Sequence, residues 1–320
     1  MNQSQATAII VTHNSEAQIT GCLTALTEAG LTVRVVDNAS ADGTTALIED
    51  RFPGVRLTVN RANVGFAAAV NQALAETDTD TLLLVNPDCT MPAATARALI
   101  MMLRVHPHVG VVGPRLVDPR GAIAISAHPF ETWTTVLASR FGGGLLPVWL
   151  RRLLCGPRRR HVYDACHDPG PPVAVDWLSG ACLAVRTSLL KQIGGLDEGY
   201  FMYYEDEELC LQAWRRGAHV LYVPAVEAVH IGGASCSDPS RIWPHLYQSQ
   251  LRFFARHHPE TYRIVRMLVL IRAVLGIALA RTRQPTRQAK DNPRIRAWTH
   301  VARIARTAGP VSTEGRPCTS

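Results

Sequence analysis

The sequence predicts an α/β fold in which a mostly parallel central sheet is flanked by helices and followed by a C-terminal helical extension. Short β-branched runs alternate with helical stretches through the first half of the chain, and this alternation is typical of parallel strands joined by helices. Thr81–Val85 is apolar throughout, as expected of a strand that is buried on both faces. With 320 residues, 47% of them hydrophobic and 18% charged, the chain can bury a full core.

The elements of the first half are each marked by a change in residue pattern. The polar clusters that follow the strands predict turns, and Asp42-Gly43 is a typical turn pair. The predicted strands are Ala8–Val11, Thr32–Val36, Val55–Val59, Thr81–Val85 and Val109–Val112. The predicted helices are Glu16–Ala29, a helix that ends near Arg51, and Phe66–Ala75.

The middle of the chain, residues 118–172, is rich in Gly, Pro and Arg. This composition predicts a variable, loop-rich region with one short amphipathic piece near residues 145–154. Order is expected to return at Val173–Arg186, followed by a helix at Glu207–Arg216 and a strand at His219–Val223. We expect one main domain over residues 1–260 and a basic helical tail over 261–320 with a disordered end.

The positive charge of the chain lies in its tail. Residues 261–320 contain 12 basic and 2 acidic residues, whereas residues 1–260 contain 21 basic and 24 acidic residues. The tail therefore suits an anionic surface, either a membrane or a polyphosphate, although a solvated end explains it equally well. Ile264–Ala280 could lie in a membrane interface or pack as an ordinary helix. A nucleic-acid partner is not expected, because the folded body is acidic and lacks an aromatic-basic motif.

The eight cysteines show no C-x-x-C spacing, and several lie in apolar runs as free core thiols do. No signal peptide or membrane-spanning run is visible, since the longest apolar run, Met267–Ala280, is short and contains Arg272. We therefore expect a cytoplasmic protein, located at the inner face of the plasma membrane if the tail binds lipid.

Polar residues follow four successive predicted strands. They are Thr12-His13-Asn14, Asp37-Asn38, the stretch 60–65, and Asn86-Pro87-Asp88. Ligands of open α/β sheets bind outside the carboxyl ends of the strands, so these residues are expected to converge on one crevice. Neither a G-x-G-x-x-G fingerprint nor a phosphate-binding P-loop is present. A metal ion is then the natural neutraliser of a bound phosphate, and Asp88 is a suitable ligand for Mg²⁺ or Mn²⁺.

A second acidic group, residues 205–208, is expected around the start of the helix at Glu207. Glu207 and Glu208 can be explained by the helix dipole, whereas Glu205 and Asp206 are expected in the preceding loop, where at least one of them can face a cleft. Closely spaced carboxylates raise each other's pKa, which suits a general base. His230 considered alone is more typical of a core histidine, and it becomes a candidate metal ligand only if it lies beside Asp88.

Several segments taken together resemble glycosyltransferase family 2, whose members have the GT-A fold, a Rossmann-like sheet flanked by helices. The segments are AIIVTHNSE, VVDNASADGT, NRANVGFAAAVNQAL, LLLVNPDC, WLSGACLAVR and GGLDEGYFMYYEDEELCLQAWRRGAHVLYVPAVEAVHIGG, which lie between about residues 6 and 235. Within the family, the chain is most similar to the bacterial rhamnosyltransferase-like branch.

The resemblance implies a role for each matching position. Thr12 and Asn14 would line the nucleobase pocket, Asp37 would bind the base, and Asn63 and Gly65 would lie near the nucleoside. Asn86 and Asp88 stand at the family's D-x-D motif, where Asn replaces the first acid, so that Asp88 with His230 would bind the metal. Asp206 of the Glu205-Asp206 pair would be the catalytic base. Trp177, Ser179 and Gly180 would border the donor sugar and the acceptor.

The implied activity is metal-dependent, inverting transfer of a sugar from a nucleoside-diphosphate donor to a hydroxyl of a saccharide or polyprenyl-linked acceptor, in the synthesis of cell-surface glycans. The expected donor is dTDP-rhamnose. The alternatives are another donor such as a UDP-sugar (galactofuranose, hexose or N-acetylhexosamine), or a sugar-nucleotide-binding protein without catalysis.

Overall fold

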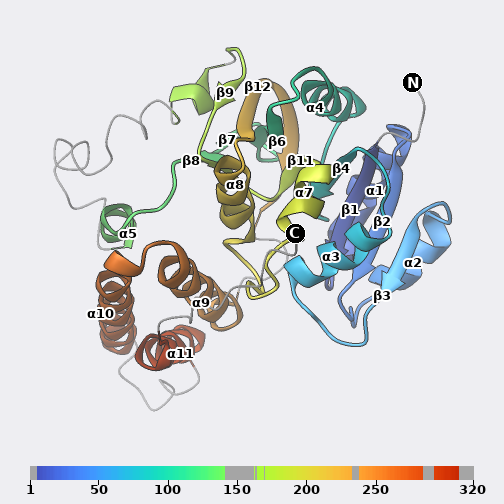
Figure 1. The fold of residues 1–320 in the computed structure, drawn as a ribbon. Helices are drawn as coiled ribbons and strands as arrows, with labels where there is room; N and C mark the ends of the chain where they lie inside the picture. Colours follow the sequence, from blue (N-terminus) through green and yellow to red (C-terminus); the bar gives the residue numbers. More distant parts are fainter. Residues whose placement is uncertain are drawn as a thin grey trace. The chain divides into compact units, whose positions relative to one another are not determined.

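The computed structural model describes residues 6–140, 162, 164–168, 170–232, 238–283 and 292–309. The chain divides into two units, which we call the sheet unit and the helical unit (Figure 1). The sheet unit contains Met1–Phe130, Gly156–Phe201 and Glu205–Ser237, and the helical unit contains Glu131–Cys155, Met202–Tyr204 and Asp238–Ser320. The helical unit thus includes residues before 260, and the domain boundary expected at that residue stays a prediction.

The sheet unit is built on a sheet with the strand order β3-β2-β1-β4-β11-β6-β12-β5. β11 is antiparallel to both of its neighbours, whereas β3, β2, β1, β4, β6 and β12 all run in one direction, so the predicted mostly parallel sheet is confirmed. The strands of this path are β1 (Ala6–Thr12), β2 (Thr32–Asp37), β3 (Arg56–Val59), β4 (Thr81–Val85), β5 (Cys89–Thr90), β6 (Val109–Val117), β11 (Cys182–Arg186) and β12 (His219–His230). Two short strands, β7 (Ile123–Ala124) and β9 (Val173–Ala174), pair with β6 and β12.

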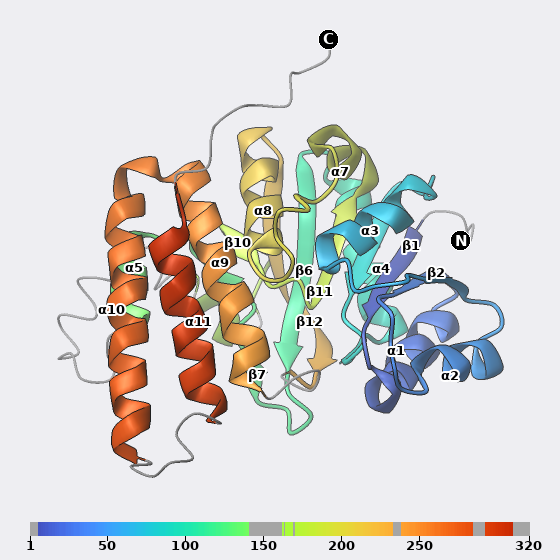
Figure 2. The ribbon, with the colours of Figure 1, turned by 90° about the horizontal axis from the view of Figure 1, so that it is seen from below.

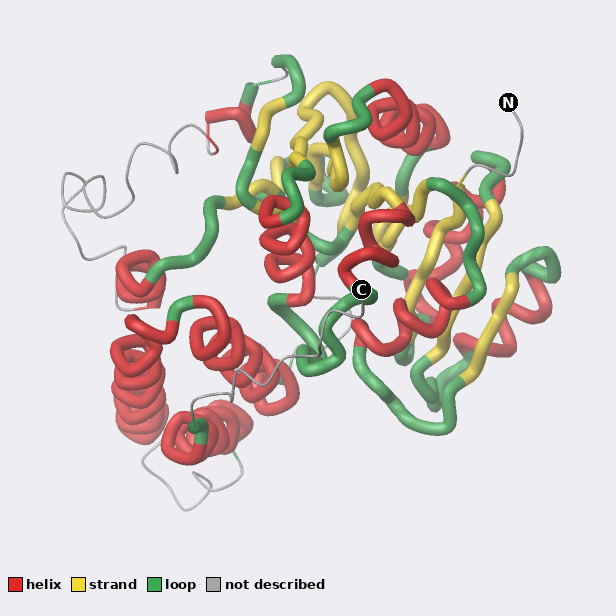
Figure 3. Tube along the Cα trace, viewed as in Figure 1, coloured by secondary structure: helices red, strands yellow, loops and turns green. Residues whose placement is uncertain are grey.

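The two faces of this sheet carry separate hydrophobic cores. Successive residues of β4 alternate between them: Leu82 and Leu84 belong to one core, and Leu83 and Val85 to the other. This period of two is the geometry of a strand. One core is completed by α3 (Phe66–Ala75), α7 (Thr187–Ile193) and α8 (Glu205–Arg215), and the other by α1 (Glu16–Glu28), α2 (Thr44–Arg51) and α4 (Ala93–Val105). The sheet is therefore a middle layer between two layers of helices (Figure 3).

Several predicted boundaries need correction. α8 begins at Glu205, so Glu205 and Asp206 lie in its first turn and not in the loop before it. α4, with Leu99 and Leu103 buried on one face, was not predicted at all. β12 continues past Val223 to His230, which makes His230 the last residue of a strand.

The region 118–172 contains more regular structure than predicted. α5 (Trp133–Arg140) is a helix, and the short strands β8 (Ala127–His128) and β10 (Trp177–Leu178) pair with each other. The amphipathic piece expected near residues 145–154 lies outside the described residues, as does the expected disordered end of the chain.

The helical unit contains α5, α9 (Pro239–His257), α10 (Pro259–Arg283) and α11 (Pro293–Thr307), and α10 packs against the other three. Figure 2 shows the three long helices side by side. Trp298 of α11 is the centre of their core: its ring lies 4.4 Å from that of Trp243 and 5.6 Å from that of Tyr247. Gly276 of α10 makes room for this ring, since a Cβ there would lie 2.4 Å from Trp298 Nε1.

None of the helices in the described ranges combines the length and the hydropathy that a bilayer span requires.

Candidate active site

The polar residues predicted at the carboxyl ends of β1, β2 and β3 come together. The backbone N–H of Asn38 donates to the carbonyl of Thr12 over 2.8 Å, and the N–H of Asn60 donates to the carbonyl of Asp37 over 2.8 Å. The Asn60 side chain in turn donates to Oδ1 of Asn38 over 2.9 Å. The three strand ends therefore form one continuous edge of the sheet, as expected for a ligand crevice.

Asp37 is held by hydrogen bonds within this edge. Its Oδ1 accepts from the hydroxyls of Thr12 (2.7 Å) and Ser40 (2.5 Å), and its Oδ2 accepts from the N–H of Ser40 (2.8 Å). Asp37 and Thr12 are both fully buried, so their side chains form the floor of the edge. Ser40 is not among the predicted site residues, although an aspartate in a turn commonly accepts hydrogen bonds from the backbone that follows it.

Asn14 and Asn63 are exposed residues of the loops above this floor. Oδ1 of Asn14 accepts from the N–H of Ala41 over 2.7 Å, and Asn14 has a positive φ of 53°. Oδ1 of Asn63 accepts from the N–H of Gly65 over 3.0 Å. Both side chains thus order the loops in which they lie.

Gly65 brings the segment before α8 to the same edge. Its φ is 87°, and a Cβ there would lie 2.7 Å from the carbonyl oxygen of Phe201. That carbonyl accepts a hydrogen bond from the N–H of Phe66 over 3.0 Å. Only glycine combines this backbone conformation with so close an approach.

Asp88 and His230 meet at the ends of β4 and β12. Oδ1 of Asp88 lies 3.3 Å from Nε2 of His230, and the carbonyl of Asp88 accepts from the N–H of Ile231 over 3.1 Å. Asp88 is buried and His230 half-buried. A carboxylate oxygen and an imidazole nitrogen at this separation can act as ligands of one divalent cation.

The donor set fits a metal that is shared with a phosphorylated ligand. Across the described part of the chain, no third His, Cys, Asp or Glu joins Asp88 and His230 in a group that could hold a metal ion. Mg²⁺ is usually bound by one or two protein ligands together with substrate phosphates and water. Two protein ligands at an open edge are therefore compatible with Mg²⁺ or Mn²⁺.

Asp206 is anchored in the first turn of α8. Its Oδ2 accepts from the N–H of Gly180 over 2.9 Å, and its Oδ1 accepts from the N–H of Glu207 over 2.9 Å. These donors and the amino end of the helix favour the ionised carboxylate. Glu205 differs, because its Oε2 is buried with no hydrogen-bond partner among the described residues.

The pKa values of the two carboxyls follow from these surroundings. Burial, and then the neighbouring charge of Asp206, raise the pKa of Glu205 to about 8. Burial also raises the pKa of Asp206, while its hydrogen bonds from Gly180 and Glu207 oppose the rise. With a pKa of about 8, Glu205 keeps its proton at neutral pH, and Asp206 is the carboxyl of the pair whose charged form is stabilised by hydrogen bonds.

A chain of backbone contacts links Asp206 to the Asp88 side of the site. Asp206 binds the N–H of Gly180, and the next residue, Ala181, accepts from the N–H of Asn86 over 2.9 Å. Asp88 follows two residues later. Asp206, Asn86 and Asp88 thus belong to one edge, formed where β4 ends and β11 begins.

Trp177 lies beside this edge in β10. Its indole N–H donates to the carbonyl of Pro129 over 3.0 Å, and its ring stacks on His128 at 4.3 Å with an angle of 23° between the ring planes. Ser179 donates its N–H to the carbonyl of Ser126 over 2.8 Å. These contacts tie the segment that contains Gly180 to the neighbouring 126–129 segment.

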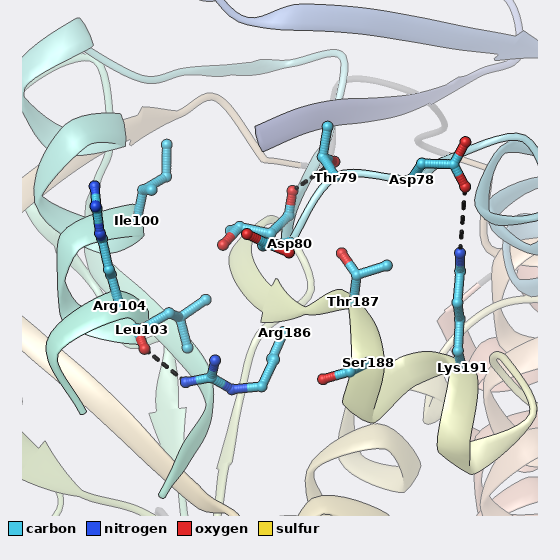
Figure 4. Close-up of a pocket in the computed structure, with 11 residues that line it drawn as sticks. Asp78, Thr79, Asp80, Ile100, Leu103, Arg104, Arg186, Thr187, Ser188 and Lys191 are labelled. Atoms are coloured by element: carbon cyan, nitrogen blue, oxygen red, sulfur yellow. Dashed lines mark hydrogen bonds and ion pairs between the residues drawn. The ribbon is translucent and has the colours of Figure 1, made fainter. Parts of the chain in front are cut away.

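A separate cavity of about 440 Å³ lies at the opposite edge of the sheet, around the start of β4 and the end of β11 (Figure 4). Two of its cations serve the fold: Arg186 donates to the carbonyls of Leu103, His106 and Val109, and Lys191 donates to that of Thr77 over 2.8 Å. None of the predicted site residues lines this cavity.

Comparison with known proteins gives the following likenesses. Residues 7–141 match the family model described as "Glycosyl transferase family 2". The chain is 32% identical over 252 residues to the N-acetylglucosaminyl-diphospho-decaprenol L-rhamnosyltransferase of Mycobacterium tuberculosis, an alignment that covers 75% of this chain and 76% of the relative.

Two solved structures have a similar fold. One is the mannosyltransferase PcManGT from Pyrobaculum calidifontis in complex with GDP-Man and Mn²⁺, with a TM-score of 0.52, 17% identity and coverage of 94% of this chain and 86% of that one. The other is GalNAc-T7 with UDP, GalNAc and Mn²⁺, with a TM-score of 0.54 and 14% identity. That likeness covers 79% of this chain and 48% of the longer neighbour.

Proposed function

Since the chain belongs to glycosyltransferase family 2 and resembles its rhamnosyltransferases, we propose that it transfers rhamnose from dTDP-rhamnose to a hydroxyl of a polyprenyl-linked saccharide, with inversion at the anomeric carbon. The family membership makes the chain a glycosyltransferase, and the expected GT-A fold with a C-terminal helical region is confirmed by the solved neighbours. The donor, the acceptor, the metal and the stereochemistry are the proposed part.

The observation that carries the proposal is that Asp206 and the contacting pair Asp88–His230 lie at the same sheet edge. Asp206 is held by the N–H of Gly180, and Asp88 lies 3.3 Å from His230. Sugar transfer needs both groups: a base for the attacking hydroxyl, and a neutraliser for the departing diphosphate. A protein that only binds sugar nucleotides has no need of a base in this position.

In the proposed mechanism, Asp206 accepts the proton of the acceptor hydroxyl as the oxygen attacks the anomeric carbon on the face opposite the diphosphate. The bond to the diphosphate oxygen breaks as the new glycosidic bond forms, so one displacement inverts the configuration. The N–H groups of Gly180 and Glu207 hold the Asp206 carboxylate in place before the acceptor binds. Glu205 stays protonated beside Asp206, so Asp206 is the carboxylate that takes the proton of the acceptor hydroxyl.

Asp88 and His230 would hold the divalent cation, with Asn86 beside them. When bound, the cation supplies positive charge to the diphosphate as it leaves. The nucleoside would lie over the floor made by Thr12 and Asp37, bordered by the loops of Asn14, Asn63 and Gly65. Trp177 and Gly180 would border the donor sugar and the acceptor.

The rhamnose donor and the lipid-linked acceptor are proposed from the Mycobacterium tuberculosis relative, whose name gives that sugar and a diphospho-decaprenol acceptor. An acceptor of this kind would place the enzyme at the cytoplasmic face of a membrane. The solved neighbours are bound to UDP or GDP-Man, so a UDP- or GDP-sugar is the alternative donor on the same machinery.

A donor screen tests the proposal. Thermal unfolding is measured with Mn²⁺ and each of dTDP-rhamnose, UDP-sugars and GDP-sugars, because a ligand that binds the folded state raises the melting temperature. The stabilising donor is then incubated with a synthetic polyprenyl-diphospho-saccharide, and the anomeric configuration of the product is read by NMR. We expect dTDP-rhamnose to stabilise the protein and the product to be inverted. Retention of configuration, or no shift with any donor, would contradict the proposal.

A further inference from the structure

α10 carries a row of exposed apolar side chains along most of its length. Twelve large hydrophobic residues of the described part of the chain are exposed, and six of them belong to this one helix. They lie three or four residues apart, except that Val274 and Leu275 are adjacent, and this spacing places them on a single face. They are Ile264 (37% exposed), Met267 (55%), Ile271 (41%), Val274 (49%), Leu275 (52%) and Leu279 (51%), and we call them the α10 stripe.

The opposite face of α10 is the one that packs in the helical unit. Val265, Val269 and Ala273 are buried there, and Gly276 lies against Trp298. Arg266 donates to the carbonyls of Ala305 and Arg306 in α11. Apart from Leu268, which is buried and falls between Leu275 and Leu279 around the helix, the α10 stripe is therefore a second apolar face that stays exposed when α10 packs against α5, α9 and α11.

Arginines flank the α10 stripe. At about 100° per residue, Arg263 and Arg281 fall on one side of it and Arg272 on the other. α10 contains five arginines and a single acidic residue, and α11 contains four arginines and none. The guanidinium of Arg272 lies over the Trp298 ring at 4.8 Å, while Arg263 and Arg281 are exposed. A wide apolar face bordered by basic residues is the pattern of helices that lie in a bilayer interface.

We propose that the α10 stripe inserts into the surface of an anionic bilayer, with Arg263 and Arg281 against lipid headgroup phosphates. The helix lies in the interface and does not cross the membrane, in keeping with its arginine content. A second copy of the chain suits the α10 stripe less well than an anionic bilayer does. Pairing along this row would bring the flanking arginines of two copies together, with one glutamate per helix to offset them.

The inference does not depend on the sugar or on the site residues, because it rests on the exposure, spacing and charge of one helix. It also gives the proposed lipid-linked acceptor a physical route to the enzyme, since an enzyme held at the bilayer surface meets such an acceptor in two dimensions.

The test is co-sedimentation of the full-length protein with vesicles of phosphatidylcholine containing 30% phosphatidylglycerol, compared with pure phosphatidylcholine vesicles, at low and high salt. We expect binding to the anionic vesicles that weakens with salt. Replacing Arg263 and Arg281 together by glutamine should lower the partition coefficient on the order of 25-fold, at about fivefold for each arginine. The double variant Met267→Glu with Leu275→Glu should lower it at least about 100-fold.

The matched control is Met101→Glu with Val105→Glu, which makes the same change at exposed apolar positions of α4 in the sheet unit. This variant should bind vesicles like the original protein, and all variants should keep the circular dichroism spectrum and donor-induced thermal shift. Unchanged binding by the α10 glutamate variant would overturn the proposal. A second result would also overturn it: the original protein binds neither kind of vesicle and forms a dimer in analytical ultracentrifugation, and the α10 glutamate variant is a monomer.

Discussion

The backbone N–H of Gly180 donates a 2.9 Å hydrogen bond to Oδ2 of Asp206, which lies 26 residues further along the chain. The bond joins the entry to β11 to the first turn of α8. It also fixes one carboxylate oxygen, so the position of Asp206 is set within the folded chain, and the bond opposes the rise that burial causes in its pKa.

We predict that Asp206→Asn lowers kcat by about 10²–10⁴ and leaves the Kd of the donor within about twofold, because the amide cannot accept the acceptor's proton. Asn keeps the size of Asp and can still accept a hydrogen bond from Gly180. The measurements are steady-state transfer and donor titration by calorimetry. The control is Asp80→Asn, an exposed carboxylate at the opposite edge, which should transfer normally. Normal turnover by Asp206→Asn would exclude the base role.

A second prediction concerns Asp88 and His230. Replacing His230 by alanine, or Asp88 by asparagine, removes one of two protein ligands and should weaken Mn²⁺ binding in the presence of a nucleoside diphosphate at least about tenfold. Mn²⁺ paramagnetic resonance measures the bound metal directly, independently of activity. His219→Ala, a histidine at the start of β12, is the control at the other end of the same strand. Equal metal binding by all of these proteins would remove Asp88 and His230 from the metal site.

The third prediction concerns the cost of a side chain at Gly65. Gly30→Ala introduces a Cβ at a φ of 73° into open space, so it should cost about 1–2 kcal/mol of unfolding free energy. Gly65→Ala places a side chain at φ 87° and ψ 169°, a backbone conformation that is essentially restricted to glycine, and it also drives the Cβ against the carbonyl oxygen of Phe201. We expect it to cost about 1–3 kcal/mol more and to weaken donor binding. Urea unfolding measures both variants, and equal losses would show that the contact with Phe201 is unimportant.

The fourth prediction is a pH dependence of stability. The pKa of Glu205 is raised to about 8 in the folded protein, whereas an unfolded glutamate titrates near 4.3. Between these values the unfolded chain loses the proton first, so Glu205 contributes a stability that is full below the unfolded pKa and declines as pH rises toward 8. Glu205→Gln should flatten this decline and raise the unfolding free energy at pH 8 by about 1–3 kcal/mol. Denaturant titrations from pH 5 to pH 8.5 check it, and an equally steep decline in the variant would contradict it.

The sequence predicted the sheet better than the connections between its strands. Thr81–Val85 and Phe66–Ala75 match the observed elements residue for residue, because continuous burial and helical periodicity leave strong patterns. α4 carries such a pattern too, with Thr95, Leu99 and Leu103 on one face, and was overlooked. The predicted start of α8 differs from the observed one. Tyr203 and Tyr204, just before the helix, have φ values of 70° and 71°, and a tyrosine in the sequence gives no sign of a positive φ.

The candidate site was predictable in its location and less so in its contacts. Polar residues after successive strands indicate a shared edge, since parallel strands end together. The sequence does not show that the Asp37 carboxylate accepts three hydrogen bonds from Thr12 and Ser40. Nor could it separate the proton affinities of Glu205 and Asp206, which depend on the N–H of Gly180 and on burial within the folded chain.

The reversed direction of β11 has a consequence for how such enzymes can diversify. Because β11 runs against β4, the chain enters the sheet at the working edge through Ser179 and Gly180, after the long excursion that follows β6. The proposed nucleotide-binding residues Thr12 to Asp88 therefore all precede residue 90, and the proposed base Asp206 and its partner Gly180 both follow residue 176. If Asp206 is the proposed base, the chain supplies it and the residues of the nucleotide edge from two separate stretches of sequence, so substitutions in one stretch leave the other unchanged.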